Sequence, residues 1–150
     1  MSGSVTVRMR ATPEAIWDLV ADVTRIGEFS PETFEAEWLE GATGPAAGAK
    51  FRGHVKRNGV GPVYWAPCEV TECVPGRVFG FAVGTAERPM NSWRYEITPT
   101  DDGADVTESF ALPDNPMTRV YWLLLGRARG RTNERGMRQT LERIRAVVEA

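Results

Sequence analysis

An acidic residue within an otherwise apolar strand is the sharpest chemical signal in this sequence. In the predicted strand 104–112, side chains point alternately to the two faces of the sheet. Glu108 therefore shares a face with Val106 and Phe110, and its carboxyl group is expected to point toward the core. Desolvation there would raise the pKa of the carboxyl group and make it a candidate proton donor or a hydrogen-bonding group for a ligand. An arginine partner would instead lower this pKa and mark a structural ion pair, and a local bulge would turn the side chain outward.

Histidine and cysteine offer little for metal or nucleophilic chemistry. One histidine, His54, and two cysteines cannot build a conventional metal site, and His54 is predicted on a polar strand face. Cys68 and Cys73 lie five residues apart in one predicted strand, about 16 Å from each other and on opposite faces, so we expect free thiols. The sequence contains no phosphate-binding loop, nucleophile elbow or zinc-protease motif. We therefore assign no catalytic residue, no metal and no cofactor.

Aromatic residues recur on the predicted strands and ahead of the last predicted helix. Core packing can account for any one of them, but together they indicate an apolar cavity with a few polar groups, as small-molecule sites have. Phe34 is expected to share a strand face with Ala36 and Trp38. Tyr121, Trp122 and Leu125 come ahead of the last helix. The residues predicted to line a ligand-binding cavity are Trp38, Phe51, Phe81, Trp93, Tyr95, Glu108, Phe110, Tyr121 and Leu125.

The net charge of −2 is unevenly distributed along the chain. Residues 119–150 hold eight arginines and three acidic residues, whereas residues 1–118 hold 10 basic and 17 acidic residues. A basic C-terminal helix could meet phosphates or anionic lipid, or it could dock on the acidic body of the protein with its arginines in solvent. The segment Arg127–Arg131 lacks interleaved aromatic residues, so nucleic-acid binding is not expected.

The sequence predicts a cytoplasmic protein without integral membrane association. Its longest apolar run, Val120–Leu125, is far shorter than the roughly 18 residues of a membrane span. Residues 1–10 lack the apolar region of a signal peptide. Transient contact with an anionic membrane is compatible with these features, and the pattern leaves monomer and homodimer open.

Strand and helix signals predict one α+β domain over residues 1–150. Thr12-Pro13 and Asp22 begin two short helices after the first strand. Tight turns, including Asn58-Gly59, join the later strands and make the sheet antiparallel. The predicted strands cover residues 5–10, 34–39, 49–57, 62–74, 77–84, 92–98 and 104–112. Pro67, inside one of them, predicts an edge position or a bulge.

The C-terminal segment has the period of an amphipathic helix that covers the sheet. Its apolar positions, at spacings of four, three and four, are Met137, Leu141, Ile144 and Val148. The glycines at 126, 130 and 136 favour a break or a kink, and we expect a short helix near 116–125 and a main helix near 130–148.

Several motifs, in this order, resemble the START-like (SRPBCC) helix-grip superfamily in its polyketide cyclase/dehydrase branch. They are Ala11-Thr12-Pro13-Glu14-Ala15-Ile16-Trp17, Asp22-Val23, Ser30-Pro31-Glu32, Trp38-Leu39-Glu40-Gly41, Gly48 with Phe51 and Gly53, Val70-Thr71-Glu72, Pro75-Gly76-Arg77, Phe79 with Phe81, and Val106-Thr107-Glu108. The resemblance implies a helix-grip fold, in which a curved seven-stranded antiparallel sheet wraps around a long C-terminal helix. It also implies a cavity between them for lipids, sterols, polyketides or plant hormones.

Three functions are compatible with these observations. The first is binding or transport of a hydrophobic small molecule or lipid in the cavity under the C-terminal helix. The second is a polyketide cyclase or dehydratase, in which Glu108 or Tyr95 would transfer protons. The third is a protein-binding module of a toxin–antitoxin or stress system, with Val120–Leu125 as its contact.

Overall fold

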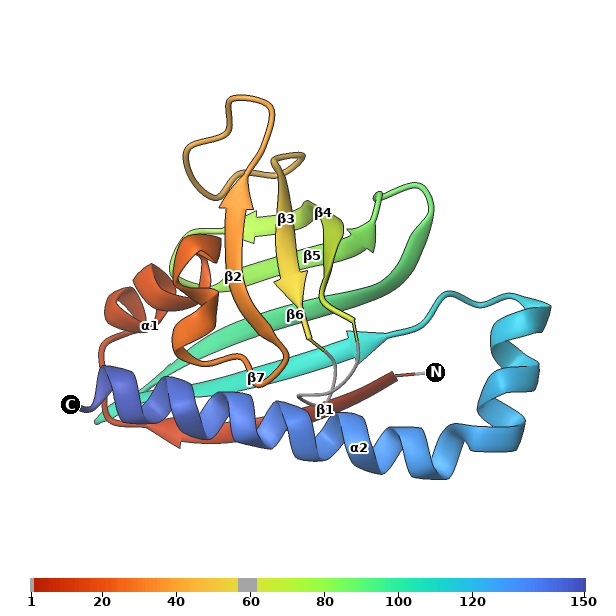
Figure 1. Ribbon diagram of the computed structural model, residues 1–150. Helices are drawn as coiled ribbons and strands as arrows, with labels where there is room; N and C mark the ends of the chain where they lie inside the picture. The colour runs from red at the N-terminus through yellow and green to blue at the C-terminus, as the bar shows by residue number, and fades with distance from the viewer. Residues whose placement is uncertain (1, 57–61) are drawn as a thin grey trace.

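The computed structural model describes residues 2–56 and 62–150, and its strands form one antiparallel sheet (Figure 1). The strands are β1 (Ser2–Met9), β2 (Thr33–Trp38), β3 (Lys50–Val55), β4 (Tyr64–Val74), β5 (Val78–Gly84), β6 (Pro89–Thr100) and β7 (Gly103–Ala111). Within the described residues the sheet has seven strands in the order β1-β7-β6-β5-β4-β3-β2. The predicted fold class is confirmed, and the predicted Asn58-Gly59 turn lies outside the described residues.

Two short helices follow β1, where the sequence predicts them. Thr12 caps α1 (Pro13–Val20): its hydroxyl oxygen accepts a hydrogen bond from the Ala15 amide at 3.1 Å. Asp22 caps η1 (Val23–Glu28), a 3₁₀ helix, by accepting a hydrogen bond from the Thr24 amide. These caps satisfy backbone amides that would otherwise lack partners at the helix starts.

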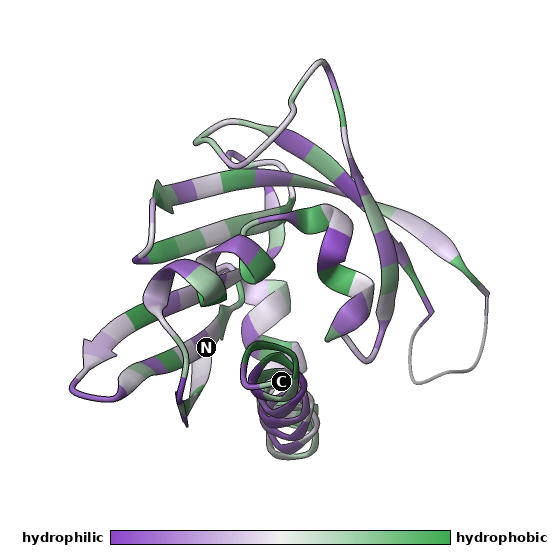
Figure 2. Cartoon of the chain, turned by 90° about the vertical axis from the view of Figure 1, so that its left-hand side faces the viewer, coloured by the Kyte–Doolittle hydropathy of each residue, from purple (hydrophilic) through white to green (hydrophobic). Residues whose placement is uncertain are grey.

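The last helix, α2 (Pro116–Val148), lies on the concave side of the sheet and packs mainly against β1. Figure 2, in which this helix is seen nearly end-on, shows the sheet curving around it. Met137, Leu141 and Ile144 are buried at the spacing predicted from the sequence. Their side chains join a core cluster with residues of β1 and β7, including Val5 and Val106.

The predicted separation of this segment into two helices is wrong. The helix is continuous from Pro116 to Val148, and its first turns are bent sharply away from the long remainder (Figure 1). Glycine is a usual cause of such bends, because it lacks a Cβ and adds backbone freedom. The glycines therefore bend the helix without ending it.

Two bulges change which side chains face the core. The register of β2 shifts between Thr33 and Glu35, so Phe34 is 48% exposed and its ring lies 4.4 Å from that of His54. The prediction that it shares a face with Ala36 and Trp38 is therefore wrong.

The second bulge lies in β4, between Val70 and Glu72. It brings Cys73 against the core on the side of Cys68, so the prediction of opposite faces is also wrong. Both cysteines are free, as predicted. Pro67 pairs with a residue of β3 but with none of β5, because the pairing of β4 with β5 begins at Cys68. This agrees with the predicted edge position.

We predict that Leu141→Ala lowers the free energy of unfolding by about 2–5 kcal/mol, because it leaves a cavity in the core between α2 and the sheet. Arg143→Ala, at an exposed position of the same helix, should change it by less than about 0.5 kcal/mol. Urea denaturation measures both values. A loss below about 1 kcal/mol for Leu141→Ala would contradict burial of this face.

Candidate functional site

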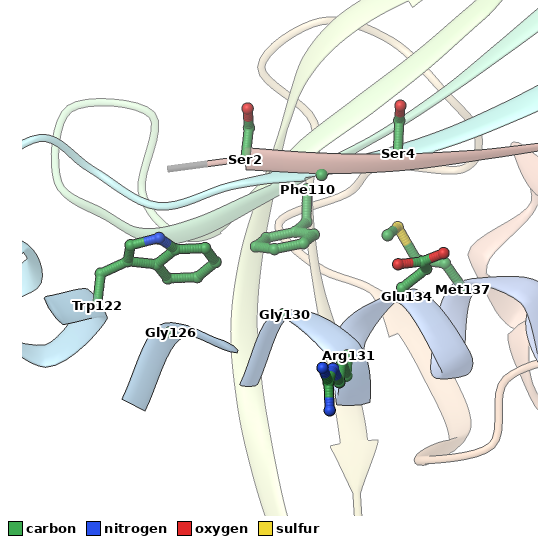
Figure 3. A pocket seen from close by; sticks show the side chains of 10 residues that line it. Ser2, Ser4, Phe110, Trp122, Gly126, Gly130, Arg131, Glu134 and Met137 are labelled. Atoms are coloured by element: carbon green, nitrogen blue, oxygen red, sulfur yellow. The ribbon is translucent and has the colours of Figure 1, made fainter. Parts of the chain in front are cut away.

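A slot of about 280 Å³ opens between the start of β1 and the middle of α2 (Figure 3). Its lining residues are Ser2, Gly3, Ser4, Phe110, Trp122, Gly126, Gly130, Arg131, Glu134 and Met137. The rings of Phe110 and Trp122 lie between the strand and the helix, with centroids 6.3 Å apart. Three elements, β1, β7 and α2, therefore border the slot, whose walls combine polar and apolar groups.

Glycines on both walls make room for the two rings. Gly3 lies opposite Phe110 in the ladder, and a Cβ there would come within 2.8 Å of the Phe110 ring. On the helix, a Cβ at Gly126 would lie 3.0 Å from the Trp122 ring, and one at Gly130 would lie 3.8 Å from it. Larger residues at the first two positions would displace a ring, whereas a side chain at Gly130 would extend into the slot.

The polar groups that line the slot are backbone groups of β1 and the side chains of Glu134 and Arg131. The side chains of Ser2 and Ser4 point away from α2, so the backbone of β1 forms this wall (Figure 3). In the described sheet, β1 is an edge strand that pairs only with β7. Its outer edge therefore presents amides and carbonyls without a sheet partner. Glu134 points toward β1, whereas Arg131 points away from it (Figure 3). The slot therefore offers both donors and acceptors of hydrogen bonds to a ligand.

Glu108 is buried behind the slot. It lies two residues from Phe110 in β7, opposite Val5 on one side and Tyr95 on the other. The residue is only 4% exposed, and its Oε2 has no hydrogen-bond partner among the described residues. The prediction that Glu108 faces the core is thus confirmed, without an outward bulge.

Burial raises the pKa of Glu108 to about 8, while a hydrogen-bonding interaction with Tyr95 acts in the opposite direction. Burial and the nearby carboxyl group together raise the pKa of Tyr95 well above its usual value. Near neutral pH, both groups therefore carry their protons. Glu108 is a neutral acid here, and no arginine among the described residues forms the ion pair that would have lowered its pKa.

The other predicted cavity residues lie outside the slot. Phe51 and Tyr95 are fully buried, and Phe51 packs edge-to-face on the rings of Trp38 and Phe81 at 5.7 and 5.2 Å. Trp93 is half-buried, and its indole N–H donates to Asn91 Oδ1 at 3.0 Å. These aromatic side chains fill the space inside the curved sheet, so Phe110 alone of the predicted set lines the slot.

The helix contributes a different residue from those predicted. Tyr121 is 39% exposed, and Leu125 lines a second hollow on the outer surface of α2. Trp122, which was not assigned to the cavity, lines the slot instead. Its spacing from Gly126 and Gly130, four and eight residues, puts all three on one helix face, and this pattern is visible in the sequence.

Metal-ligating and nucleophilic side chains do not gather at the slot. Among the described residues, no group of three or more His, Cys, Asp or Glu side chains could hold a metal ion. His54 lies on the polar face, as predicted, where its Nδ1 is 2.7 Å from Glu35 Oε1 and its ring stacks on Trp65. Burial raises the pKa of the Cys68 thiol to about 12, which keeps it protonated and unreactive at neutral pH.

The curved antiparallel sheet around a C-terminal helix, with a slot between them, defines a helix-grip protein. The chain belongs to the polyketide cyclase / dehydrase and lipid transport family, whose model matches residues 1–149. No curated protein matches the chain.

Solved structures share this fold over nearly the whole chain. A protein of unknown function from Staphylococcus aureus, SA2116, is 12% identical with a TM-score of 0.73, over 99% of this chain and 93% of its own. The polyketide-cyclase-like protein Cgl2372 from Corynebacterium glutamicum is 26% identical with a TM-score of 0.62, over 99% and 91%. The di-domain ARO/CYC StfQ of steffimycin biosynthesis is 12% identical with a TM-score of 0.74, over 99% of this chain and 50% of StfQ.

We predict that Glu108 makes the protein less stable as the pH rises. Between the ordinary pKa of 4.5 in the unfolded chain and about 8 in the folded protein, only the folded state keeps the proton. The free energy of unfolding should therefore fall by up to about 1.4 kcal/mol per pH unit in this range. Glu108→Gln has no proton to lose and should lack this slope.

Urea denaturation of both proteins from about pH 5 to about pH 8 measures the difference. Glu87→Gln, at an exposed loop position, is the matched control and should follow the wild type. Parallel pH profiles of wild type and Glu108→Gln would show that the carboxyl group titrates as it does in water.

Proposed function

We propose that this protein binds a hydrophobic small molecule or lipid in the slot between β1, β7 and α2. The observation that supports this most is the space of about 280 Å³ beside the paired rings of Phe110 and Trp122, which glycines on both walls leave free of side chains. The half-buried Trp122 offers apolar area that a ligand would remove from water, whereas Phe110 is already buried. The volume is close to the lower end of the range for small-molecule sites.

The polar groups narrow the class of ligand. The Glu134 carboxylate and the carbonyls of the β1 edge accept hydrogen bonds, so a hydroxyl or N–H on an otherwise apolar molecule would satisfy them. The opposite charges of Glu134 and Arg131 leave the lining without a net charge. We therefore expect a neutral ligand, such as an aromatic or fused-ring molecule with a hydroxyl group, or a neutral lipid.

The second hollow, of about 440 Å³, is a weaker candidate for this ligand. Its lining residues, which lie between Trp122 and Ala128, all belong to α2. A surface formed by one helix cannot surround a ligand, whereas small-molecule sites bury most of the ligand surface. The smaller slot is bordered by three elements and is the better site.

A polyketide cyclase or dehydratase is the alternative function. It is favoured by the buried pair of Tyr95 and Glu108, because a protonated carboxyl group beside a phenol can donate a proton to a carbonyl group. Neither residue lines the slot, however, and Phe110 lies between Glu108 and the slot along β7. A general acid must reach the reacting atom, so the arrangement supports binding better than catalysis.

We predict that Gly130→Leu blocks the slot and lowers the affinity for the neutral dye N-phenyl-1-naphthylamine by about tenfold or more. Leucine also favours a helix more than glycine does, so the fold should persist. Gly136→Leu is the matched control: it lies on the same helix, where a Cβ meets no atom within 4 Å and no slot residue is altered.

Dye fluorescence measures the affinity, and circular dichroism verifies the fold. If Gly130→Leu fails to fold, Gly130→Ala provides the milder test, with a smaller loss expected. Equal affinities for wild type, Gly130→Leu and Gly136→Leu would overturn the slot as the binding site. In a separate experiment, native mass spectrometry of protein purified from its own host would identify the natural ligand by its mass.

A further inference from the structure

The first turns of α2 expose an apolar face that nothing in the described chain covers. Its central residues follow the i, i+3, i+4, i+7 spacing of one helix face. The large apolar residues exposed on this segment are Met117 (83%), Val120 (57%), Tyr121 (39%), Leu123 (84%), Leu124 (75%) and Leu125 (53%). We call residues 117–125 the apolar tip. Contiguous exposed apolar surface of this kind marks an interaction site.

The apolar tip points away from the body of the protein. Trp122 and Gly126, on the other side of the helix, line the slot and hold this part of α2 against the sheet. The bend directs the first turns outward at one end of the molecule (Figure 1). The tip is thus accessible to a large flat partner without any rearrangement of the slot.

Positive charge follows the apolar tip directly. Between residues 126 and 138 the sequence has arginines at positions 127, 129, 131, 135 and 138, and Glu134 is the one acidic residue. Arg131, Arg135 and Arg138 are exposed. Within the tip, Arg119 forms an ion pair with Asp114 at 2.8 Å, so these two charges cancel.

We propose that the apolar tip docks on the surface of an anionic phospholipid bilayer, with Arg131, Arg135 and Arg138 at the level of the lipid headgroups. An interfacial helix buries its apolar face about 5–10 Å into the boundary between headgroups and acyl chains, while basic residues bind anionic headgroups. The run Val120–Leu125 is about 9 Å long, and no helix in the described residues is long and apolar enough to cross a membrane. The contact is therefore shallow.

Charge favours a bilayer over a second copy of this chain. In a symmetric dimer through the apolar tip, the same surface of both copies would meet, and the two arginine-rich segments would lie near each other and repel. An anionic bilayer attracts the same segment. It also orients the molecule, because the remainder of the chain is acidic.

Vesicle co-sedimentation with the full chain tests the proposal. The wild type should bind phosphatidylcholine vesicles that contain about 30% phosphatidylserine and bind pure phosphatidylcholine at least about tenfold more weakly. The double variant Leu123→Ser/Leu124→Ser should bind the anionic vesicles about tenfold more weakly, because it removes apolar area. Arg135→Glu/Arg138→Glu should show a similar loss. Met90→Ser, a change at an exposed apolar residue outside the tip, is the control and should bind as the wild type does.

Three results would overturn the proposal. The first is a wild type that does not bind anionic vesicles, or that binds both kinds equally. The second is a wild-type dimer in sedimentation velocity that Leu123→Ser/Leu124→Ser converts to a monomer, since a second copy would then cover the tip. The third is a fall of more than about 5 °C in the Tm of this variant, which would show that the chain itself covers the tip. Leu123→Ser/Leu124→Ser should bind the dye in the slot as the wild type does. A failure of the membrane proposal can therefore be distinguished from a failure of the slot proposal.

Discussion

The packing of α2 against β1 and β7 is the contact on which the other features depend. Met137, Leu141 and Ile144 hold the C-terminal two-thirds of the helix on the concave side of the sheet. This contact covers Glu108, and desolvation of Glu108 is the cause of its raised pKa. It also places Gly126 and Gly130 beside the start of β1, which opens the slot. The first turns of α2, which precede this contact, remain exposed.

The helix-grip fold has an interior that could be either a cavity or a core, and here most of it is core. The rings of Trp38, Phe51 and Phe81 pack edge-to-face, which is a favourable geometry for aromatic pairs. The remaining space lies at one side of the sheet, where β1 is the edge strand. A ligand in the slot would therefore contact backbone groups as well as side chains, unlike a ligand enclosed in the centre of the fold.

The sequence was sufficient for the strand order along the chain, the helix caps and the buried face of α2. These depend on local rules: Thr12 and Asp22 cap helices, and Met137, Leu141 and Ile144 recur at helical spacing. The orientation of Glu108 was also predictable, because alternation is unbroken in β7. Alternation failed at Phe34 and Cys73, since a bulge inverts every side chain beyond it and has no clear sequence signal.

The site itself was harder to predict from the sequence. Which aromatic residue fills the core and which borders a space depends on how far the sheet curves and on where α2 lies across it. Only the helix offered a local clue, in the spacing of Trp122, Gly126 and Gly130. Of the nine predicted cavity residues, Phe110 lines the slot, whereas Trp122, which also lines it, was not among them.

The position of β1 has a practical consequence for handling the protein. Ser2, Gly3 and Ser4 form one wall of the slot, so an affinity tag or fusion partner joined ahead of them would emerge at its mouth. The two ends of the chain lie at opposite sides of the molecule (Figure 1). A tag after Ala150 would leave the entrance clear. In a ligand screen, an N-terminal tag would therefore obstruct the slot and lower the measured affinity.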